Sequence, residues 1–136
     1  MKCIMFDMDG TLIDSIGGWF GSCSYFLKEM NLEETDELKE MFKGKKLYAR
    51  GIAIGKYYNL DLTPDEIYAK NLKYVKEGYD EIYGAKDNVM NALDYLKEKG
   101  YKISLNTATN IGLCKNCLER TGSILTIFKL VMIVDI

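Results

Sequence analysis

Two aspartates, Asp7 and Asp9, follow a short apolar run and are the first side chains in the chain suited to catalysis. The run from Cys3 to Phe6 is uncharged and β-favouring, which predicts a short buried strand. Side chains alternate along a strand, so we expect both carboxylates on the same side where the strand ends. Adjacent carboxylates repel each other, and a bound cation or an acid/base task would explain the pair. Gly10 then lets the chain turn without a Cβ clash.

The stretch from Asp7 to Ser15, DMDGTLIDS, resembles the first motif of the haloacid dehalogenase-like (HAD) superfamily, in its phosphatase and β-phosphoglucomutase-like branch. The resemblance implies that Asp7 is the nucleophile and Asp9 the general acid/base. It also implies Mg²⁺ as cofactor, held by the carboxylate of Asp7 and the backbone carbonyl of Asp9. The alternative is an acidic turn that caps a strand, but such a turn needs one Asp and one Gly rather than this whole string.

The stretch from Ser104 to Asn110, SLNTATN, resembles the family's second motif, in which Ser or Thr at a strand end binds the transferring phosphoryl group. Thr107 is the matching position, and the resemblance implies phosphate binding by Thr107 and Ala108 together with Gly10. A hydroxyl and free backbone N–H groups at a helix N-terminus form an anion site. Ligands of open α/β sheets lie at the carboxyl ends of strands, where Thr107 would meet the two aspartates. The alternative is that these residues only cap the next helix.

Between the two motifs the sequence predicts helices with no strand among them, hence a small helical bundle. Gly17 and Gly18 suit a flexible join before it. Thr63, Pro64 and Glu66 form a capping box and a proline start for the last helix. The predicted helices cover residues 19–30, 33–42, 47–58 and 64–77. In the resembling family this is the place of an inserted helical cap.

The second half alternates helix and strand, which predicts a parallel sheet. We expect helices at 87–99 and 111–120, a strand at 101–105 and a third strand within 124–134. The predicted fold class is therefore α/β: a parallel Rossmann-like HAD core with three strands and an inserted helical cap. The core would comprise residues 1–15 and 80–136, and the cap residues 16–79.

Composition and charge argue against nucleic-acid and membrane partners. The 136 residues carry a formal net charge of −2 with acids and bases interspersed, which gives no nucleic-acid footprint. The sequence has no apolar run of membrane-spanning length and no basic-then-apolar leader, so we expect a cytoplasmic protein without a membrane partner. The expected partner is a small phosphorylated metabolite.

Cys114 and Cys117 form a C-x-x-C, the spacing of a redox pair or of half a zinc site. Zinc requires four ligands, and the chain has no histidine and no second C-x-x-C. The two thiols lie at i and i+3 with Ile111 and Leu118 on a predicted helix, which favours two small buried side chains. A thiol-redox protein stays an alternative, but only Lys115 nearby would favour a thiolate.

The family's later motifs, a lysine and an acidic pair that completes the Mg²⁺ site, have no counterpart in the sequence before its last residue, Ile136. Asp135 is a poor substitute, because the family's strand order places the third strand about 10 Å from the first. Two Mg²⁺ ligands must lie within about 4 Å of each other. We also expect an exposed edge on the first strand, through which the chain could self-associate.

These observations predict a Mg²⁺-dependent phosphatase of small phosphate monoesters that acts through an aspartyl-phosphate, impaired in this truncated chain. One alternative is a non-catalytic phosphate-binding remnant. Another is a β-phosphoglucomutase-like phosphotransferase, less favoured because such mutases share a cap-linker histidine and this chain has none.

Overall fold

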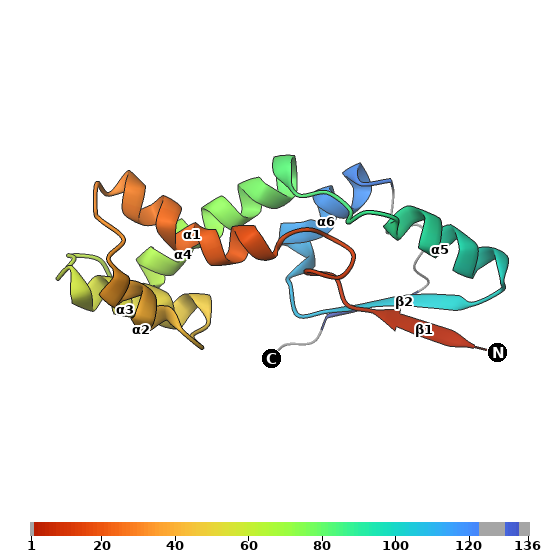
Figure 1. Cartoon of the computed structure of the whole chain (residues 1–136), viewed down its shortest axis with the longest axis horizontal. Coiled ribbons are helices and arrows are strands. Elements are labelled where there is room, and N and C mark those ends of the chain that lie inside the picture. The colour runs from red at the N-terminus through yellow and green to blue at the C-terminus, as the bar shows by residue number, and fades with distance from the viewer. Residues whose placement is uncertain (1, 123–129, 134–136) are drawn as a thin grey trace. The chain divides into compact units, whose positions relative to one another are not determined.

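The computed structural model describes residues 2–122 and 130–133 (Figure 1). Strands and helices follow one another in the order β1 (Cys3–Phe6), α1 (Ile16–Glu29), α2 (Asp36–Phe42), α3 (Leu47–Tyr57), α4 (Pro64–Glu77), η1 (Gly78–Ile82), α5 (Val89–Glu98), β2 (Lys102–Thr107), α6 (Ile111–Arg120) and β3 (Leu130–Ile133). The fold class is α/β, as predicted.

The chain divides into two compact units. The first, here called the core unit, comprises Met1–Ile16 and Lys76–Ile136 and contains the sheet. The second, the helical unit, comprises Gly17–Val75. Each is described by itself below.

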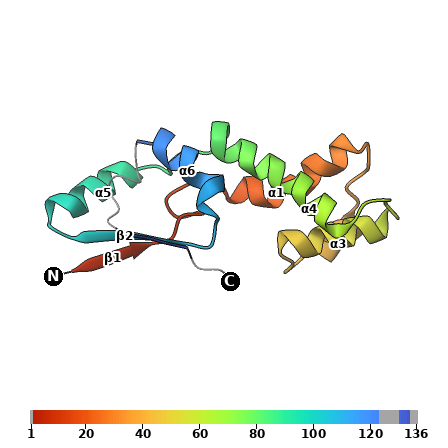
Figure 2. The ribbon, with the colours of Figure 1, turned by 180° about the vertical axis from the view of Figure 1, so that it is seen from behind.

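The sheet of the core unit is parallel and has the strand order β1-β2-β3. Phe6 is paired with Leu105, so the residues after β1 lie level with the end of β2. Figures 1 and 2 show β1 and β2 side by side, with α5 along β2. β3 is two places from β1, as the family resemblance implies, and Asp135 lies outside the described residues.

The prediction that the first strand is buried is wrong. Cys3 is exposed and Met5 is 63% exposed, while Ile4 and Phe6 are half-buried. The physical reason is the position of β1: among the described strands it is the outer one and pairs only with β2. The free edge is the one that the sequence analysis expects.

Apolar packing holds the helical unit together. Phe26 of α1 and Ile54 of α3 are fully buried, and Ile67 of α4 is 1% exposed. They belong to one cluster with Cys23, Leu27, Leu38, Phe42 and Ala53. The cluster thus draws its members from all four helices of this unit.

Two helix starts in the helical unit differ from the prediction. Gly17 and Gly18 lie inside α1 rather than in a flexible join, and α2 begins at Asp36 rather than at Glu33. Thr35 sets this start, because its side chain accepts a hydrogen bond from the Leu38 N–H (3.2 Å).

The start of α4 is confirmed as a capping box. The backbone N–H of Thr63 donates to Glu66 Oε2 (2.7 Å), and the N–H of Glu66 donates to Thr63 Oγ1 (3.3 Å). After α4 comes a five-residue π-helix, η1, that the sequence analysis does not predict.

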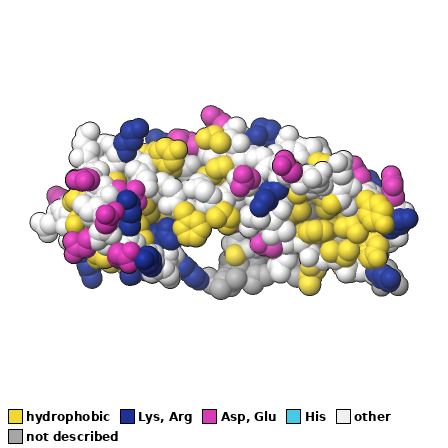
Figure 3. Space-filling model, in the orientation of Figure 1, with side chains coloured by type: hydrophobic (Ala, Val, Ile, Leu, Met, Phe, Trp, Pro, Cys, Tyr) yellow, Lys and Arg dark blue, Asp and Glu magenta, His cyan; other side chains and the backbone are white. Residues whose placement is uncertain are grey.

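The later elements match closely. α6 has the predicted bounds, α5 lies inside its predicted range, and β2 extends two residues beyond Leu105. β3 falls within the predicted range 124–134. The other residues of that range, 124–129 and 134, lie outside the described residues. Charged side chains of both signs are interspersed over the visible surface (Figure 3).

Candidate active site

The loop after β1 is a tight backbone turn. The N–H groups of Leu12 and Ile13 both donate to the carbonyl of Met8 (2.9 and 3.0 Å), and the N–H of Gly10 donates to the carbonyl of Ile13 (2.8 Å). Gly10 has φ +76°, and a Cβ there would lie 2.7 Å from Ile16 Cγ1. The turn therefore requires glycine at this position.

This loop is fastened to the segment that returns from the helical unit. The N–H of Asp14 donates to the carbonyl of Gly84 (2.9 Å), and the N–H of Lys86 donates to the carbonyl of Leu12 (2.9 Å). The ammonium of Lys86 also reaches the carbonyl of Gly10 (3.1 Å). Three hydrogen bonds thus join the first motif to residues 84–86.

Three hydroxyl groups donate hydrogen bonds to the carboxylate of Asp9. Ser15 Oγ donates to Oδ1 (2.5 Å), Thr109 Oγ1 donates to Oδ2 (2.6 Å), and the hydroxyl of Tyr79 also donates to Oδ1. Ser15 and Tyr79 are fully buried and Thr109 is 8% exposed. Such bonds to a charged acceptor are strong and fix its orientation.

Asp7 has a different environment. It is exposed directly after β1, and within the described residues its carboxylate accepts no hydrogen bond. The two aspartates of the motif therefore differ: one carboxylate is held by hydroxyls and the other is open to solvent. This difference suits two separate tasks, since a nucleophile must reach its target and a proton carrier must be oriented.

The second motif meets the first through Thr109. Thr107 is buried at the end of β2, and its Oγ1 accepts a hydrogen bond from the N–H of Thr109 (3.1 Å). Ala108 between them is exposed. Asn110 caps α6 by accepting from the N–H of Gly112 (2.7 Å). A side-chain hydrogen bond therefore joins Asp9 to Thr109, whereas the side-chain hydrogen bond described for Thr107 lies within its own turn.

Sequence reasoning gives no role to the three hydroxyl residues around Asp9. Ser15 and Thr109 lie inside the two motifs, so their place in the sequence is a usable signal. Tyr79 is one of ten tyrosines and lies 70 residues from Asp9 in the sequence. Its role depends on the tertiary fold alone.

Cys114 and Cys117 are free thiols buried on α6. Burial raises the pKa of Cys114 to about 12, and the negative charge of Asp9 adds to the increase. Burial also raises the pKa of Cys117, while Arg120 lowers it and Asp9 raises it. Both thiols are protonated at neutral pH, which disfavours thiolate chemistry.

The donor atoms at the end of β1 fit a hard cation. The Asp7 carboxylate is exposed, and the Asp9 backbone carbonyl accepts none of the loop's backbone hydrogen bonds. Among the described residues no group of three or more His, Cys, Asp or Glu side chains is placed to hold a metal ion. Mg²⁺ often binds through one or two carboxylates while waters and substrate phosphate complete its shell, so these oxygen donors suit it.

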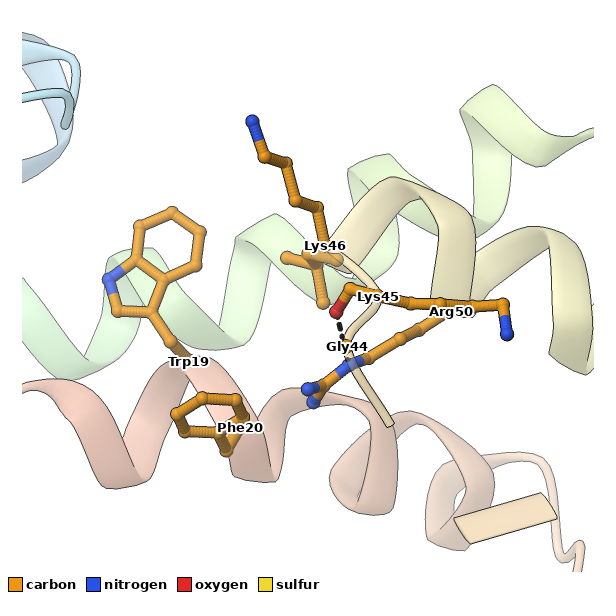
Figure 4. Close-up of a pocket in the computed structure, with 7 residues that line it drawn as sticks. Trp19, Phe20, Gly44, Lys45, Lys46 and Arg50 are labelled. Atoms are coloured by element: carbon orange, nitrogen blue, oxygen red, sulfur yellow. Dashed lines mark hydrogen bonds between the residues drawn. The ribbon is translucent and has the colours of Figure 1, made fainter. Parts of the chain in front are cut away.

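The helical unit has a separate open pocket of about 390 Å³ (Figure 4). Trp19 and Phe20 of α1 line one side, and the other side carries Lys45, Lys46 and Arg50. Two of these cations are already engaged: Lys45 Nζ donates to the carbonyl of Met41 (2.6 Å) and Arg50 Nε to that of Lys45 (2.9 Å). Arg50 also lies 4.8 Å from the ring centre of Phe20. The lining combines aromatic faces with positive charge, which suits an anion with an apolar part.

Comparison with known families identifies the class. The profile of the haloacid dehalogenase-like hydrolases matches residues 4–136. The chain belongs to this family. No protein among the curated ones matches the sequence.

Solved structures agree on the fold. A candidate β-phosphoglucomutase from Thermotoga maritima superposes with a TM-score of 0.82 at 20% identity, over 98% of this chain and 61% of that one. A predicted phosphoglycolate phosphatase from Haemophilus somnus gives 0.71 at 26%, over 97% and 62%. The Bacillus subtilis HAD-hydrolase YfnB bound to magnesium gives 0.73 at 16%, over 97% and 64%. The chain thus spans about three fifths of these structures.

Among its described helices, none has the length and apolar character needed to cross a membrane.

Proposed function

We propose that the chain carries the reaction centre of a Mg²⁺-dependent phosphatase that hydrolyses small phosphate monoesters through a phosphorylated Asp7. The observation that carries this proposal is the pairing of an exposed Asp7 with an Asp9 oriented by three hydroxyls at the carboxyl end of a parallel strand. A family whose members include hydrolases, and a solved relative described as a phosphoglycolate phosphatase, support the reaction type.

In the proposed mechanism an Asp7 oxygen attacks the phosphorus atom and the bond from phosphorus to the ester oxygen breaks. Asp9 gives its proton to that departing oxygen, so the alcohol leaves neutral. Asp9 then takes a proton from a water molecule, whose oxygen attacks the phosphorus of the phosphorylated Asp7. The bond to Asp7 breaks and phosphate is released, so that Asp7 is again a carboxylate and Asp9 again carries a proton.

Mg²⁺, when bound, would neutralise charge between the anionic nucleophile and the anionic substrate. The Asp7 carboxylate and the Asp9 carbonyl are the groups of this chain that would hold it. Thr107, Ala108 and Gly10 are the proposed phosphate contacts. Thr107 and Ala108 lie just before α6, whose N-terminal N–H groups favour anions. Within this proposal the helical unit acts as the cap that admits the substrate.

Release of phosphate from p-nitrophenyl phosphate, with and without Mg²⁺, tests the proposal. Asp7→Asn should abolish the release, and mass spectrometry of the parent chain should detect one phosphoryl group on Asp7. Asp94→Asn is the control, since it makes the same chemical change at an exposed position of α5. Activity in Asp7→Asn equal to the parent would exclude the covalent mechanism. Phosphate binding without any turnover would instead support a non-catalytic phosphate-binding chain.

A further inference from the structure

The hydrogen bond from Tyr79 to Asp9 joins residues 70 positions apart in the sequence, and Tyr79 lies in neither of the two motifs. Tyr79 is fully buried, and its hydroxyl donates to the same oxygen, Oδ1, that accepts from Ser15. Thr109 binds the other oxygen. A large aromatic residue thus brings one hydroxyl to a carboxylate that the proposed reaction uses as proton carrier.

The backbone around Tyr79 has an unusual shape that aims its side chain. Tyr79 lies in η1, whose wide turn is closed by a hydrogen bond from the N–H of Tyr83 to the carbonyl of Gly78 (2.7 Å). A Cβ at Gly78 would overlap the Tyr83 ring. That ring packs edge-to-face on Tyr79, with centroids 5.1 Å apart and an interplanar angle of 81°. Single π-turns of this kind occur frequently at functional sites.

Helix α6 holds the same turn from the other side. Arg120 Nη2 donates to the carbonyls of Tyr79 (3.2 Å) and Tyr83 (2.6 Å). Cys117 Sγ donates to the carbonyl of Tyr83 (3.2 Å), and Asn116 Nδ2 donates to Asp80 Oδ1 (3.0 Å). The phenol therefore has little freedom to leave the carboxylate.

We propose that Tyr79 is a positioning residue that orients the Asp9 carboxylate for proton transfer, and that η1 and α6 exist in this arrangement to hold it there. This inference rests on the proposed function of Asp9. Tyr79 acts through Asp9 and is not assigned any contact with substrate. Removing its hydroxyl should therefore impair the protonation of the leaving oxygen and leave substrate binding unchanged.

The kinetic test compares two substrates in Tyr79→Phe, which keeps the ring and removes only the hydroxyl. Nitrophenolate leaves with little help from an acid, whereas an alkoxide requires protonation. We expect kcat/KM for an alkyl phosphate to fall about tenfold more than kcat/KM for p-nitrophenyl phosphate. This ratio reports the steps up to departure of the ester oxygen, and it excludes the hydrolysis of phosphorylated Asp7 that both substrates share. A purely structural role would lower kcat/KM for both substrates by the same factor, because it changes only the fraction of folded enzyme.

The matched control is Tyr95→Phe, the same change at a tyrosine of α5 that is 57% exposed. If Tyr79→Phe behaves like Tyr95→Phe while Asp7→Asn abolishes turnover, the proposed function stands and the role of Tyr79 is refuted. If Asp7→Asn retains full activity, the proposed mechanism itself fails.

A second measurement needs no turnover. The midpoint of urea unfolding is compared for Tyr79→Phe in the parent and in an Asp9→Ala background. We expect Tyr79→Phe to lower the midpoint in the parent, and to lower it much less or raise it once the carboxylate is gone, since the phenol then has lost that acceptor. Equal shifts in the two backgrounds would show that the hydroxyl and the carboxylate are not coupled, and would overturn the inference.

Discussion

Buried polar side chains serve different purposes in the two units. In the core unit Ser15, Tyr79 and Thr109 converge on one carboxylate from sequence distances of 6, 70 and 100 residues. In the helical unit the buried Ser22 and Asn71 donate to carbonyls three and four residues earlier, at Trp19 and Ile67. The hydroxyls around Asp9 are therefore a long-range polar cluster directed at a site, whereas Ser22 and Asn71 of the helical unit bond locally.

Both units also bury apolar side chains, with Leu12, Leu93 and Leu105 among those of the core unit. The helical unit buries one contiguous apolar cluster, which contributes about 25 cal/mol per Å² of surface removed from water. The hydroxyls around Asp9 lose their favourable contribution when one partner is missing, because the remaining polar atoms stay buried. We therefore expect packing changes to destabilise either unit, and changes at η1 to affect the site as well.

The largest expected effect is in the apolar cluster. Phe26→Ala should lower the free energy of unfolding by about 3–5 kcal/mol, because it leaves a cavity under α1. Urea unfolding monitored by circular dichroism measures it. Phe20→Ala removes the same side chain from a position that is 58% exposed, and should cost about 1 kcal/mol or less. Similar losses in the two variants would contradict the cluster as the source of stability.

A pair of glycine substitutions tests the turn that carries Tyr79. Gly78→Ala should destabilise the chain by about 1–3 kcal/mol, since the new Cβ displaces the Tyr83 ring. Gly17→Ala, in α1 with no atom within 4 Å of the added Cβ, should stabilise it by about 0.5–1 kcal/mol. Thermal unfolding of both variants against the parent measures the two shifts. Stabilisation by Gly78→Ala would contradict the close packing of η1.

The sequence predicts those features that depend on near neighbours. The bounds of β1 and α6 and the capping box at Thr63 all follow from short patterns and are confirmed. The first motif also leads to the family, since its residues have a fixed order. Even the early start predicted for α2 is a local error, because the side chain of Thr35 caps the helix and sets its start at Asp36.

The features that the sequence does not predict depend on distant partners. The exposure of β1 depends on which strands flank it. A short apolar run has the same sequence pattern at the edge of a sheet as at its centre, so the pattern alone does not predict that exposure. The π-turn at Gly78 depends on a ring five residues later and on α6. The contact of Tyr79 with Asp9 depends on both. The positions of Asp7 and Asp9 could thus be predicted, but not what orients Asp9.

Helix caps should contribute equally to the free energy of unfolding in the two units, because each cap hydrogen bond joins residues only two or three positions apart. Thr63→Ala removes the cap of α4 and Asn110→Ala that of α6, and each should cost about 1 kcal/mol in the free energy of unfolding. Urea titrations of the two single variants and of the double variant check both the size and the additivity. A loss in Asn110→Ala several times that in Thr63→Ala would mean that Asn110 has a further role beside the second motif.

The smallest expected effect is the pH dependence of stability that one buried thiol in each unit contributes, Cys23 and Cys114, because it is absent at neutral pH. Burial raises the pKa of Cys23 from 9.0 to about 11 and that of Cys114 from 9.0 to about 12. A raised folded-state pKa gives stability that is fully present below the unfolded value of 9.0 and is lost as the pH rises through the folded value. The stability difference between the parent and each Cys→Ala variant should therefore be constant below about pH 9.

Above that pH the parent should lose its advantage over the alanine variants, up to about pH 11 for Cys23 and about pH 12 for Cys114. Unfolding midpoints measured across this range give the difference directly. In the native chain at neutral pH a soluble thiol reagent should modify the exposed Cys3 first, which serves as the internal standard. Rapid modification of Cys114 under the same conditions would show a reactive thiolate beside Asp9 and would reopen the thiol-redox alternative.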